Sequence, residues 1–304
     1  MKTAIVIGYG SIGARHALLL DQLGLRVAVV SRRLVDHPHR FAALEDALND
    51  GVPDLVVIAS RTNEHYADFG ALGAAGYRGA VLVEKPLFDG DYPLPAHDFA
   101  YAYVAFNMRF HPLVQAFRKA LAARRIFSLH AYVGQYLPDW RPGADYRTGY
   151  SAHKAQGGGV LRDLCHELDL VSWLGGPPKM MTALGGKVSD LEIDSEDVFS
   201  LLLELENCPV ATVTTNYLDS RLRRTLVAQT DAGTLCADFA ASTLTDGDRT
   251  ITVPSERNES YLAQLQAVLN NDAEILCPLP GGQVVNAMIA NAERASTDRV
   301  WIGA

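Results

Sequence analysis

The chain has few cysteines, no long apolar run and no excess of basic residues, and each shortage excludes a class of protein. Its four cysteines among 304 residues include no CxxC pair, so the sequence predicts neither a zinc knuckle nor a disulfide framework, and no metal site. No apolar run is long enough to span a bilayer. With 27 Lys and Arg against 35 Asp and Glu, the formal net charge is −8, which argues against a nucleic-acid partner.

The N-terminus enters an apolar run directly, without the basic region and cleavage site of a signal peptide, so we expect a cytoplasmic protein with reduced thiols. The hydrophobic fraction of 48% suits a globular protein with sizeable cores, in one large domain or two ordinary ones.

A glycine motif of the form GxGxxG lies between an apolar run, residues 4–7, and a helix-like pattern, residues 14–23. A strand, a glycine turn and a helix in this order are the context in which the motif binds a dinucleotide. The glycines allow a tight turn and close approach of a pyrophosphate, and the helix N-terminus offers N–H groups to the phosphates. We therefore expect cofactor contacts from Gly8, Gly10, Ser11, Ile12 and Gly13.

The first third of the chain alternates strands with helices, which predicts a Rossmann-type, doubly wound parallel sheet in residues 1–107. The continuous apolar run at residues 55–59 is typical of a strand buried on both faces. The predicted strands are residues 4–7, 27–30, 55–59, 80–83 and 103–106, and the predicted helices are 14–23, 41–48 and 65–76.

After Asn107 the pattern changes to successive strands with short turns, which indicates an α+β domain over residues 108–304. We expect a large, mostly antiparallel sheet, open on one face and covered by helices on the other. A cleft between the two domains is then the expected place for a small-molecule site. The predicted strands are 128–135, 198–205, 210–217, 224–230 and 234–239, and the helices are 112–123, one beginning after 159, 261–269 and 284–295.

The end of the second predicted strand indicates which dinucleotide binds. NAD-binding proteins of this type usually carry an acidic residue there, but this chain has Ser31, Arg32 and Arg33. Because guanidinium groups match phosphate geometry, the sequence favours NADP, with its 2′-phosphate, over NAD. Asp36 lies further on and is the residue that could restore NAD binding.

Two segments carry candidate catalytic groups. Glu84 and Lys85 follow a buried strand, at the edge of the sheet where such folds bind ligands, so both are expected to contact the cofactor. A lysine there also supplies a positive charge to a reacting oxygen. The second segment, Gly157 to Asp169, follows three glycines, and a continuous helix would place Asp163 and His166 on one face as an oriented general base. A metal site from His153, Cys165, His166 and Asp169 matches no zinc spacing.

These pieces together resemble the Gfo/Idh/MocA oxidoreductases, a family that includes glucose–fructose oxidoreductase and inositol dehydrogenase. The resemblance lies in GYGSIGARH at residues 8–16, Glu84-Lys85-Pro86, residues 106–112, and the segment that runs to His166. It implies a Rossmann domain, a C-terminal domain whose open sheet often forms dimers or tetramers, and NAD(P)-dependent chemistry on a sugar or cyclitol. It also implies that Lys85 and His166 are catalytic, and that the peptide before Pro86 is cis.

The chain departs from the family pattern at the aspartate, which family members commonly place four residues before the histidine. Here Asp163 lies three residues before His166, and position 162 is Arg. Asp163 is therefore expected as the third catalytic residue and as a substrate contact together with His166, with Asp169 as the alternative partner of His166.

Residues after the third strand, Ser60, Arg61, Asn63 and His65, lie where the family contacts the nicotinamide half of the cofactor, and His65 equally suits a helix cap. The segment from Tyr136 to Arg147 resembles a subgroup associated with bacterial surface-sugar biosynthesis. Its aromatic residues would stack on sugar rings, and Arg141 or Arg147 would hold a carboxylate or phosphate. The expected substrate contacts are Arg109, Trp140, Arg141, Tyr146 and Arg147.

The sequence thus predicts an NADP-preferring dehydrogenase or reductase of a sugar-like substrate. In oxidation, His166 would take the hydroxyl proton and Lys85 would stabilise the developing alkoxide. Two alternatives stay open: a non-catalytic sensor of NADP(H), and a reductase of an imine or aldehyde.

Overall fold

The protein was analysed as a computed structural model that describes residues 1–303. The chain divides into two compact units. Unit 1 comprises residues 1–107 and 258–283, and unit 2 comprises residues 108–257 and 284–304. The prediction of one domain over 108–304 is therefore wrong for residues 258–283. This segment joins unit 1 because Cys277 pairs with Val104 at a sheet edge, and the Tyr103 hydroxyl donates to Asn271 at 2.9 Å.

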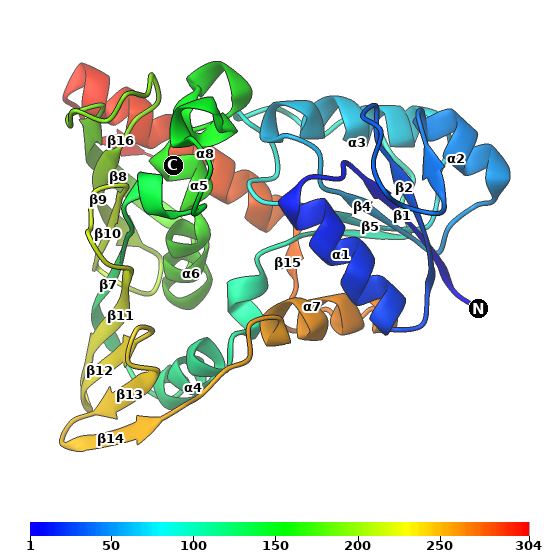
Figure 1. Cartoon of the computed structure of the whole chain (residues 1–304). Coiled ribbons are helices and arrows are strands. Elements are labelled where there is room, and N and C mark those ends of the chain that lie inside the picture. The colour runs from blue at the N-terminus through cyan, green and yellow to red at the C-terminus, as the bar shows by residue number, and fades with distance from the viewer. Residues whose placement is uncertain (304) are drawn as a thin grey trace. The chain divides into compact units, whose positions relative to one another are not determined.

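Unit 1 contains a sheet in the order β15-β6-β5-β4-β1-β2-β3, in which all neighbours except β15 are parallel. The order of strands β1 to β6 is that of a doubly wound dinucleotide-binding sheet, as predicted. Helices α1 and α7 lie on one face of this sheet, and α2 and α3 lie on the other (Figure 1). Its elements are β1 Thr3–Ile7, α1 Ser11–Gln22, β2 Arg26–Val30, β3 Arg40–Phe41, α2 Leu44–Asp50, β4 Leu55–Ile58, η1 Thr62–Glu64, α3 His65–Ala74, β5 Ala80–Val83, β6 Tyr101–Val104, α7 Glu259–Asn270 and β15 Cys277–Pro278.

Strands β4 and β5 are buried on both faces, since every one of their residues is buried. Their continuous apolar composition therefore predicted them almost to the residue. The helix expected at 41–48 begins three residues later, because Arg40 and Phe41 instead pair with Val29 and Val30 as an edge strand.

Unit 2 contains a nine-stranded sheet in the order β14-β13-β12-β11-β7-β10-β9-β8-β16, antiparallel except for the β7–β10 pair. Strand β9 alternates buried and exposed residues along its length, so one face of the sheet is apolar and covered while the other is open. Helices α4, α5 and α6 lie on the covered face (Figure 1). The elements are η2 Asn107–Phe110, α4 Pro112–Leu121, β7 Ile126–Gly134, η3 Leu137–Asp139, η4 Tyr146–Thr148, η5 Tyr150–Ala152, η6 Lys154–Gln156, α5 Val160–Asp163, α6 His166–Gly175, β8 Pro178–Gly186, β9 Val198–Leu205, β10 Val210–Asn216, β11 Arg223–Thr230, β12 Gly233–Asp238, β13 Thr243–Asp246, β14 Arg249–Thr252, α8 Leu279–Asp298 and β16 Ile302–Gly303.

The helix expected to continue unbroken after Gly159 is interrupted. Leu164 leaves the helical conformation with φ −107° and ψ 33°, so α5 ends at Asp163 and α6 begins at His166. The apolar stripe that predicted one helix is real, because Leu161, Leu164 and Leu168 are all buried, but the backbone turns between its members. The expectation that Asp163 and His166 share one helical face is therefore wrong.

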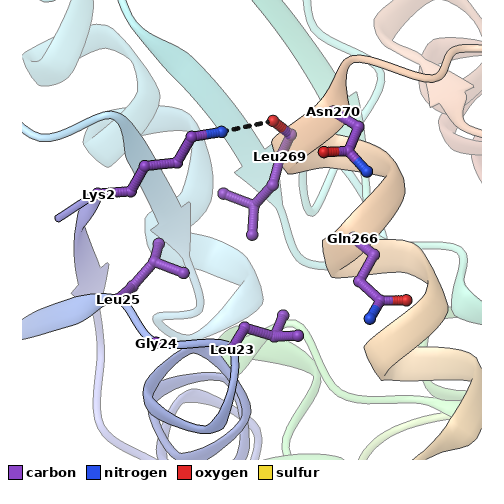
Figure 2. A pocket seen from close by; sticks show the side chains of 7 residues that line it. All are labelled: Lys2, Leu23, Gly24, Leu25, Gln266, Leu269 and Asn270. Atoms are coloured by element: carbon purple, nitrogen blue, oxygen red, sulfur yellow. Dashed lines mark hydrogen bonds between the residues drawn. The ribbon is translucent and has the colours of Figure 1, made fainter.

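A hollow of about 370 Å³ lies in unit 1 where the C-terminal ends of α1 and α7 approach each other (Figure 2). The Lys2 ammonium donates to the carbonyl of Leu269 at 2.9 Å across it. Because Lys2 and Leu25 precede β1 and β2, the hollow lies at the amino edge of the sheet, opposite the glycine turn. Its lining residues are Lys2, Leu23, Gly24, Leu25, Gln266, Leu269 and Asn270. Across residues 1–303, no helix combines the length and the apolar composition that a membrane crossing requires.

Candidate functional site

The glycine turn has the geometry that a dinucleotide requires. Gly8 adopts φ +91°, and a Cβ there would lie 2.5 Å from the carbonyl oxygen of Ala59. A Cβ on Gly13 would lie 2.1 Å from the carbonyl oxygen of Gly8, so helix and strand pack too closely for any side chain. Gly10 differs, because a Cβ there would meet open space. No side chain caps the α1 N-terminus and its first turn carries no acidic residue, so its N–H groups suit a pyrophosphate.

The turn after β2 brings two arginines close to this glycine turn. Ser31 is buried and its hydroxyl donates to the Arg33 carbonyl at 3.1 Å. Arg33 reaches the carbonyl oxygen of Tyr9, within the glycine motif, at 3.5 Å. Arg32 is exposed and forms an ion pair with Glu64, while Asp36 is also exposed. No carboxylate ends β2, but η1 supplies one to the same place.

The segment after β4 holds its own backbone in place. Ser60 donates to Asp68 at 2.5 Å, and burial raises the pKa of the Asp68 carboxyl. His65 is buried at the start of α3, with Nδ1 3.0 Å from the Pro86 carbonyl and Nε2 3.2 Å from the Ser60 carbonyl. The side chain of His65 therefore joins the ends of β4 and β5. Arg61 and Asn63 are the exposed side chains of this segment.

A buried pair of charged residues fixes the backbone at Lys85. His16 is fully buried in α1, and its Nε2 lies 2.7 Å from Oε1 of Glu84, which is 6% exposed. The other Glu84 oxygen accepts from the backbone N–H of Lys85 at 3.1 Å. Burial opposes ionisation of Glu84, but the hydrogen bond and charge of His16, with the charge of Lys85, hold its pKa below the usual range. The peptide between Lys85 and Pro86 is cis, as the resemblance implied.

We expected Glu84 to contact the cofactor. His16 was noted only as the last residue of the segment GYGSIGARH. The structure makes Glu84 a buried acceptor that holds Lys85. His16 lies 68 positions away from Glu84 in the chain. A histidine next to the apolar residues Ala17 to Leu20 of α1 was the available signal, because a buried imidazole needs a partner.

In unit 2, two tyrosines bind the carboxylate of Asp163. The Tyr217 hydroxyl donates to Oδ2 of Asp163 at 2.7 Å, and Tyr150 is hydrogen-bonded to the same carboxylate. Both hydroxyls are buried, and burial together with the Asp163 charge raises both tyrosine pKa values well above their usual range. The Asp163 carboxylate thus accepts hydrogen bonds from two buried tyrosine hydroxyls. Neither tyrosine was predicted, because Tyr217 lies at the end of a distant strand.

The alternative partner of His166, Asp169, forms a buried ion pair with Arg109. Both oxygens of Asp169 accept from the guanidinium, at 2.7 to 3.2 Å, and the guanidinium stacks over Trp173 at 5.0 Å. Arg109 is 6% exposed, and its guanidinium is engaged within unit 2, while its expected contact with the substrate stays a prediction. A second buried pair, Glu167 with Arg224 at 2.8 Å, anchors the same helix.

Position 162, where the family pattern commonly has an acidic residue, carries a buried arginine with an internal partner. Arg162 donates to Glu293 at 2.8 Å and lies 3.8 Å from Glu196. Burial raises the pKa of Glu196 to about 7. This guanidinium therefore serves the packing beneath α5, which leaves Asp163 as the acidic residue of the segment.

The aromatic loop is largely committed to internal contacts. Arg147 pairs with Asp145 at 2.8 Å and with Glu192 at 2.9 Å, and the Tyr146 hydroxyl accepts from the Glu192 N–H at 3.3 Å. The indole of Trp140 donates to the Gln135 carbonyl. Arg141 is exposed, with its guanidinium 6.0 Å from the ring centre of Tyr150. Arg147 and Tyr146 thus have partners within unit 2, Arg141 has its charge at the surface, and substrate contact by these three residues stays a prediction.

Among residues 1–303, no group of three or more His, Cys, Asp and Glu side chains is arranged to hold a metal ion. His153 instead lies 3.9 Å from Asp194 in unit 2.

Comparison with known proteins shows which family model and which solved structures resemble this chain. Residues 114–236 match a family model described as the GFO/IDH/MocA C-terminal domain. No curated protein sequence matches the chain.

Solved structures share the fold over nearly their whole length. GenD2 from gentamicin A biosynthesis, in complex with NAD, is 20% identical with a TM-score of 0.79, covering 100% of this chain and 96% of its own. The WlbA dehydrogenase from Bordetella pertussis, in complex with NADH and UDP-GlcNAcA, is 19% identical with a TM-score of 0.80, covering 100% and 99%. Levoglucosan dehydrogenase, in complex with NADH and L-sorbose, is 15% identical with a TM-score of 0.83, covering 100% and 98%. The TM-scores show that the fold is shared. Because the identities are 20% or lower, the comparison shows the fold alone.

Proposed function

We propose that this chain is an NAD(P)-dependent oxidoreductase acting on a CH–OH group of a sugar, sugar derivative or cyclitol. The match of residues 114–236 to the model of the GFO/IDH/MocA C-terminal domain supports this proposal. The observation that carries the proposal is in unit 1. Lys85 follows β5 at the carboxyl edge of the sheet that bears the glycine turn, and Glu84 and His16 hold its backbone there. Ligands bind at this edge in open α/β sheets.

The cofactor is proposed to lie along the carboxyl edge of unit 1. The backbone of residues 8–13 would hold the pyrophosphate, and Ser31, Arg32 and Arg33 the adenosine ribose with a 2′-phosphate, so NADP is preferred over NAD. When bound, the nicotinamide accepts or supplies a hydride. The complexes of GenD2 with NAD and of WlbA and levoglucosan dehydrogenase with NADH support a nicotinamide cofactor, and leave the choice between NAD and NADP to experiment.

The chemical roles fall to Lys85 and His166. In oxidation, His166 takes the proton of the substrate hydroxyl while the carbon loses a hydride, and the C–O bond becomes a carbonyl. The Lys85 ammonium stabilises the oxygen as negative charge develops on it, and in the reverse direction it polarises the carbonyl. Asp163 accepts hydrogen bonds from two tyrosines. Its proposed role is to contribute a fixed negative charge three residues before His166 in the sequence, and the proposed mechanism has no proton transfer by Asp163.

The proposed substrate is sugar-like. Two of the solved relatives support this proposal, since WlbA was solved with UDP-GlcNAcA and levoglucosan dehydrogenase with L-sorbose. Of the loop residues, Trp140 offers an aromatic surface and Arg141 an exposed charge for an anionic substituent, so we assign substrate contact to these two.

A turnover screen tests the proposal: NADPH and NADH oxidation, and NADP and NAD reduction, against sugars, keto-sugars and cyclitols. Lys85→Ala should lower kcat by roughly 100- to 1,000-fold, because it removes the charge that stabilises the reacting oxygen, while cofactor Kd changes less than about tenfold. Lys119→Ala, which removes an exposed lysine of α4 in unit 2, is the matched control.

Three outcomes would contradict the proposal in different ways. Near-wild-type turnover by Lys85→Ala would exclude the mechanism. Tight NADPH binding without turnover across the panel would indicate a non-catalytic sensor. Turnover of imines or aldehydes but not of sugars, unaffected by Arg141→Ala, would indicate a reductase of a different substrate class.

We also propose a cytoplasmic homodimer or homotetramer that assembles through the open face of the unit 2 sheet. Leu184, Leu202 and Val210 of neighbouring strands are 58%, 39% and 44% exposed. The register places Leu202 beside Thr182 and Thr212 on this face, so the exposed apolar residues alternate with small hydroxyl side chains. Such a face suits a second copy of itself.

A further inference from the structure

Hydrogen bonds to backbone carbonyls fix the turn after β2, and the side chains of Arg32 and Arg33 are exposed to solvent. The Ser31 hydroxyl donates to the Arg33 carbonyl at 3.1 Å. Arg40, from β3, donates through Nε to the carbonyls of Ser31 and Arg33 at 3.2 and 2.9 Å. These bonds use the carbonyls of the turn and leave the Arg32 side chain 79% exposed.

The guanidinium of Arg32 is paired across the sheet edge with Glu64, the last residue of η1. Arg32 follows β2 and Glu64 comes after β4, and these two strands flank β1 on either side. The ion pair therefore joins the two strands that border the glycine turn. Glu64 keeps 31% of its side chain exposed, so a solute reaches both members of the pair.

A second carboxylate lies in the same region, but it is already engaged. Asp68 accepts from the Ser60 hydroxyl at 2.5 Å. Burial and the Glu64 charge raise the pKa of Asp68, and the Arg32 charge lowers it. The three charged groups are therefore close enough to interact electrostatically. Arg33 is directed to the Tyr9 carbonyl at 3.5 Å. Glu64 is thus the carboxylate that holds Arg32.

We propose that Glu64 determines how strongly this protein prefers NADP over NAD, by competing with the 2′-phosphate for Arg32. This inference rests on the proposed function, since it assumes that a dinucleotide binds at the glycine turn. A 2′-phosphate must displace the Glu64 carboxylate from Arg32 and then lie beside it, whereas the 2′-hydroxyl of NAD requires neither change. Glu64 therefore weakens NADP binding selectively and moderates a preference that the arginines alone would make stronger.

The size of the effect follows from the exposure of the pair. An exposed ion pair contributes little, so releasing Arg32 from Glu64 strengthens phosphate binding by up to about fivefold. Removing the negative charge beside the phosphate adds a further factor of similar or smaller size. We expect Glu64→Gln to tighten NADPH binding roughly three- to tenfold, to change NADH binding less than about twofold, and to show a smaller effect at high salt.

Isothermal titration of the purified full chain with NADPH and with NADH tests this without any substrate. The variants are Glu64→Gln, Arg32→Ala, and both together. Asp98→Asn is the matched control, because it breaks an exposed arginine–carboxylate pair with Arg78, at 3.5 Å, that lies before β5 and β6 at the opposite edge of the same sheet. In the double variant the gain from Glu64→Gln should disappear, since the guanidinium it released is absent.

Equal changes in NADPH and NADH affinity, or no change in either, would overturn the inference while leaving a dinucleotide-binding protein. A gain that persists in the double variant would overturn the competition for Arg32. If the wild-type chain binds neither NADPH nor NADH, the proposed function itself fails, and the role of Glu64 fails with it.

Discussion

The buried pair of His16 and Glu84 allows a sharp prediction about stability and pH. His16→Leu keeps a side chain of similar size but removes the donor at 2.7 Å from a carboxylate that is almost fully buried. Removing one member of such a pair leaves an uncompensated buried charge, which costs about 3–5 kcal/mol of stability. For a unit the size of unit 1, that lowers Tm by roughly 10–15 °C.

The pH dependence identifies the cause. The pKa of Glu84 is depressed in the wild type, so the stability it contributes is present above the unfolded-state pKa and is lost as pH falls through the folded-state pKa. In His16→Leu burial remains without the partner, so the pKa of Glu84 rises above its unfolded value. The variant therefore loses stability as pH rises, by up to about 1.4 kcal/mol per pH unit from around pH 4 upward.

Calorimetry at pH 4.5 and 7.5 measures the difference. Trp140, Trp173 and Trp301 all belong to unit 2, so the transition of unit 1 is assigned by hydrogen exchange of β1 and β5 instead of by fluorescence. His16→Leu with Glu84→Gln removes the charge as well and should recover much of the loss. An equal loss at both pH values, or additive losses in the double variant, would refute the reasoning.

Two further predictions concern unit 2. Tyr217→Phe removes a 2.7 Å donor from buried Asp163 and should destabilise the unit by about 1.5–3 kcal/mol in urea unfolding; a loss below about 0.5 kcal/mol would show that Asp163 does not depend on this bond. Leu202→Arg places a charge on the open sheet face and should reduce the mass measured by light scattering to the 33.0 kDa of one chain, whereas Val52→Arg, an exposed apolar site of unit 1, should not. A wild-type chain that already elutes at one chain's mass would remove the proposed interface.

The sequence predicted what depends on local pattern. Buried parallel strands are continuous apolar runs, so residues 80–83 were predicted to the residue, and β9 was predicted equally well from strict alternation. Strand β8 was missed, because Pro178 and the glycines at its end disguise its alternation. Strands β13 and β14 were missed because Thr and Asp dominate them, and the pairing of neighbouring hairpins stabilises them more than their own apolar residues do.

The candidate site was predictable in its residue types but not in its contacts. The glycine turn and Lys85 stand next to strands that local pattern reveals. The partner of Glu84 lies 68 residues away and that of Asp163 lies 54 residues away, and a single sequence does not show which distant groups a fold brings together. The break at Leu164 was hidden for another reason: neither proline nor glycine marks it, and the apolar stripe continues through it.

The return of residues 258–283 to unit 1 has a consequence for synthesis on the ribosome. Strand β6 is made early, but the covering helix α7 begins 155 residues after its last residue, Val104, and its edge partner β15 begins 173 residues after it; the residues between include nearly all of the second sheet. At usual rates of translation that delay is roughly 10 to 35 s. Until then, the dinucleotide-binding sheet of the nascent chain has one unpaired edge and one face that α1 alone covers, and both are completed when translation is almost finished (Figure 1).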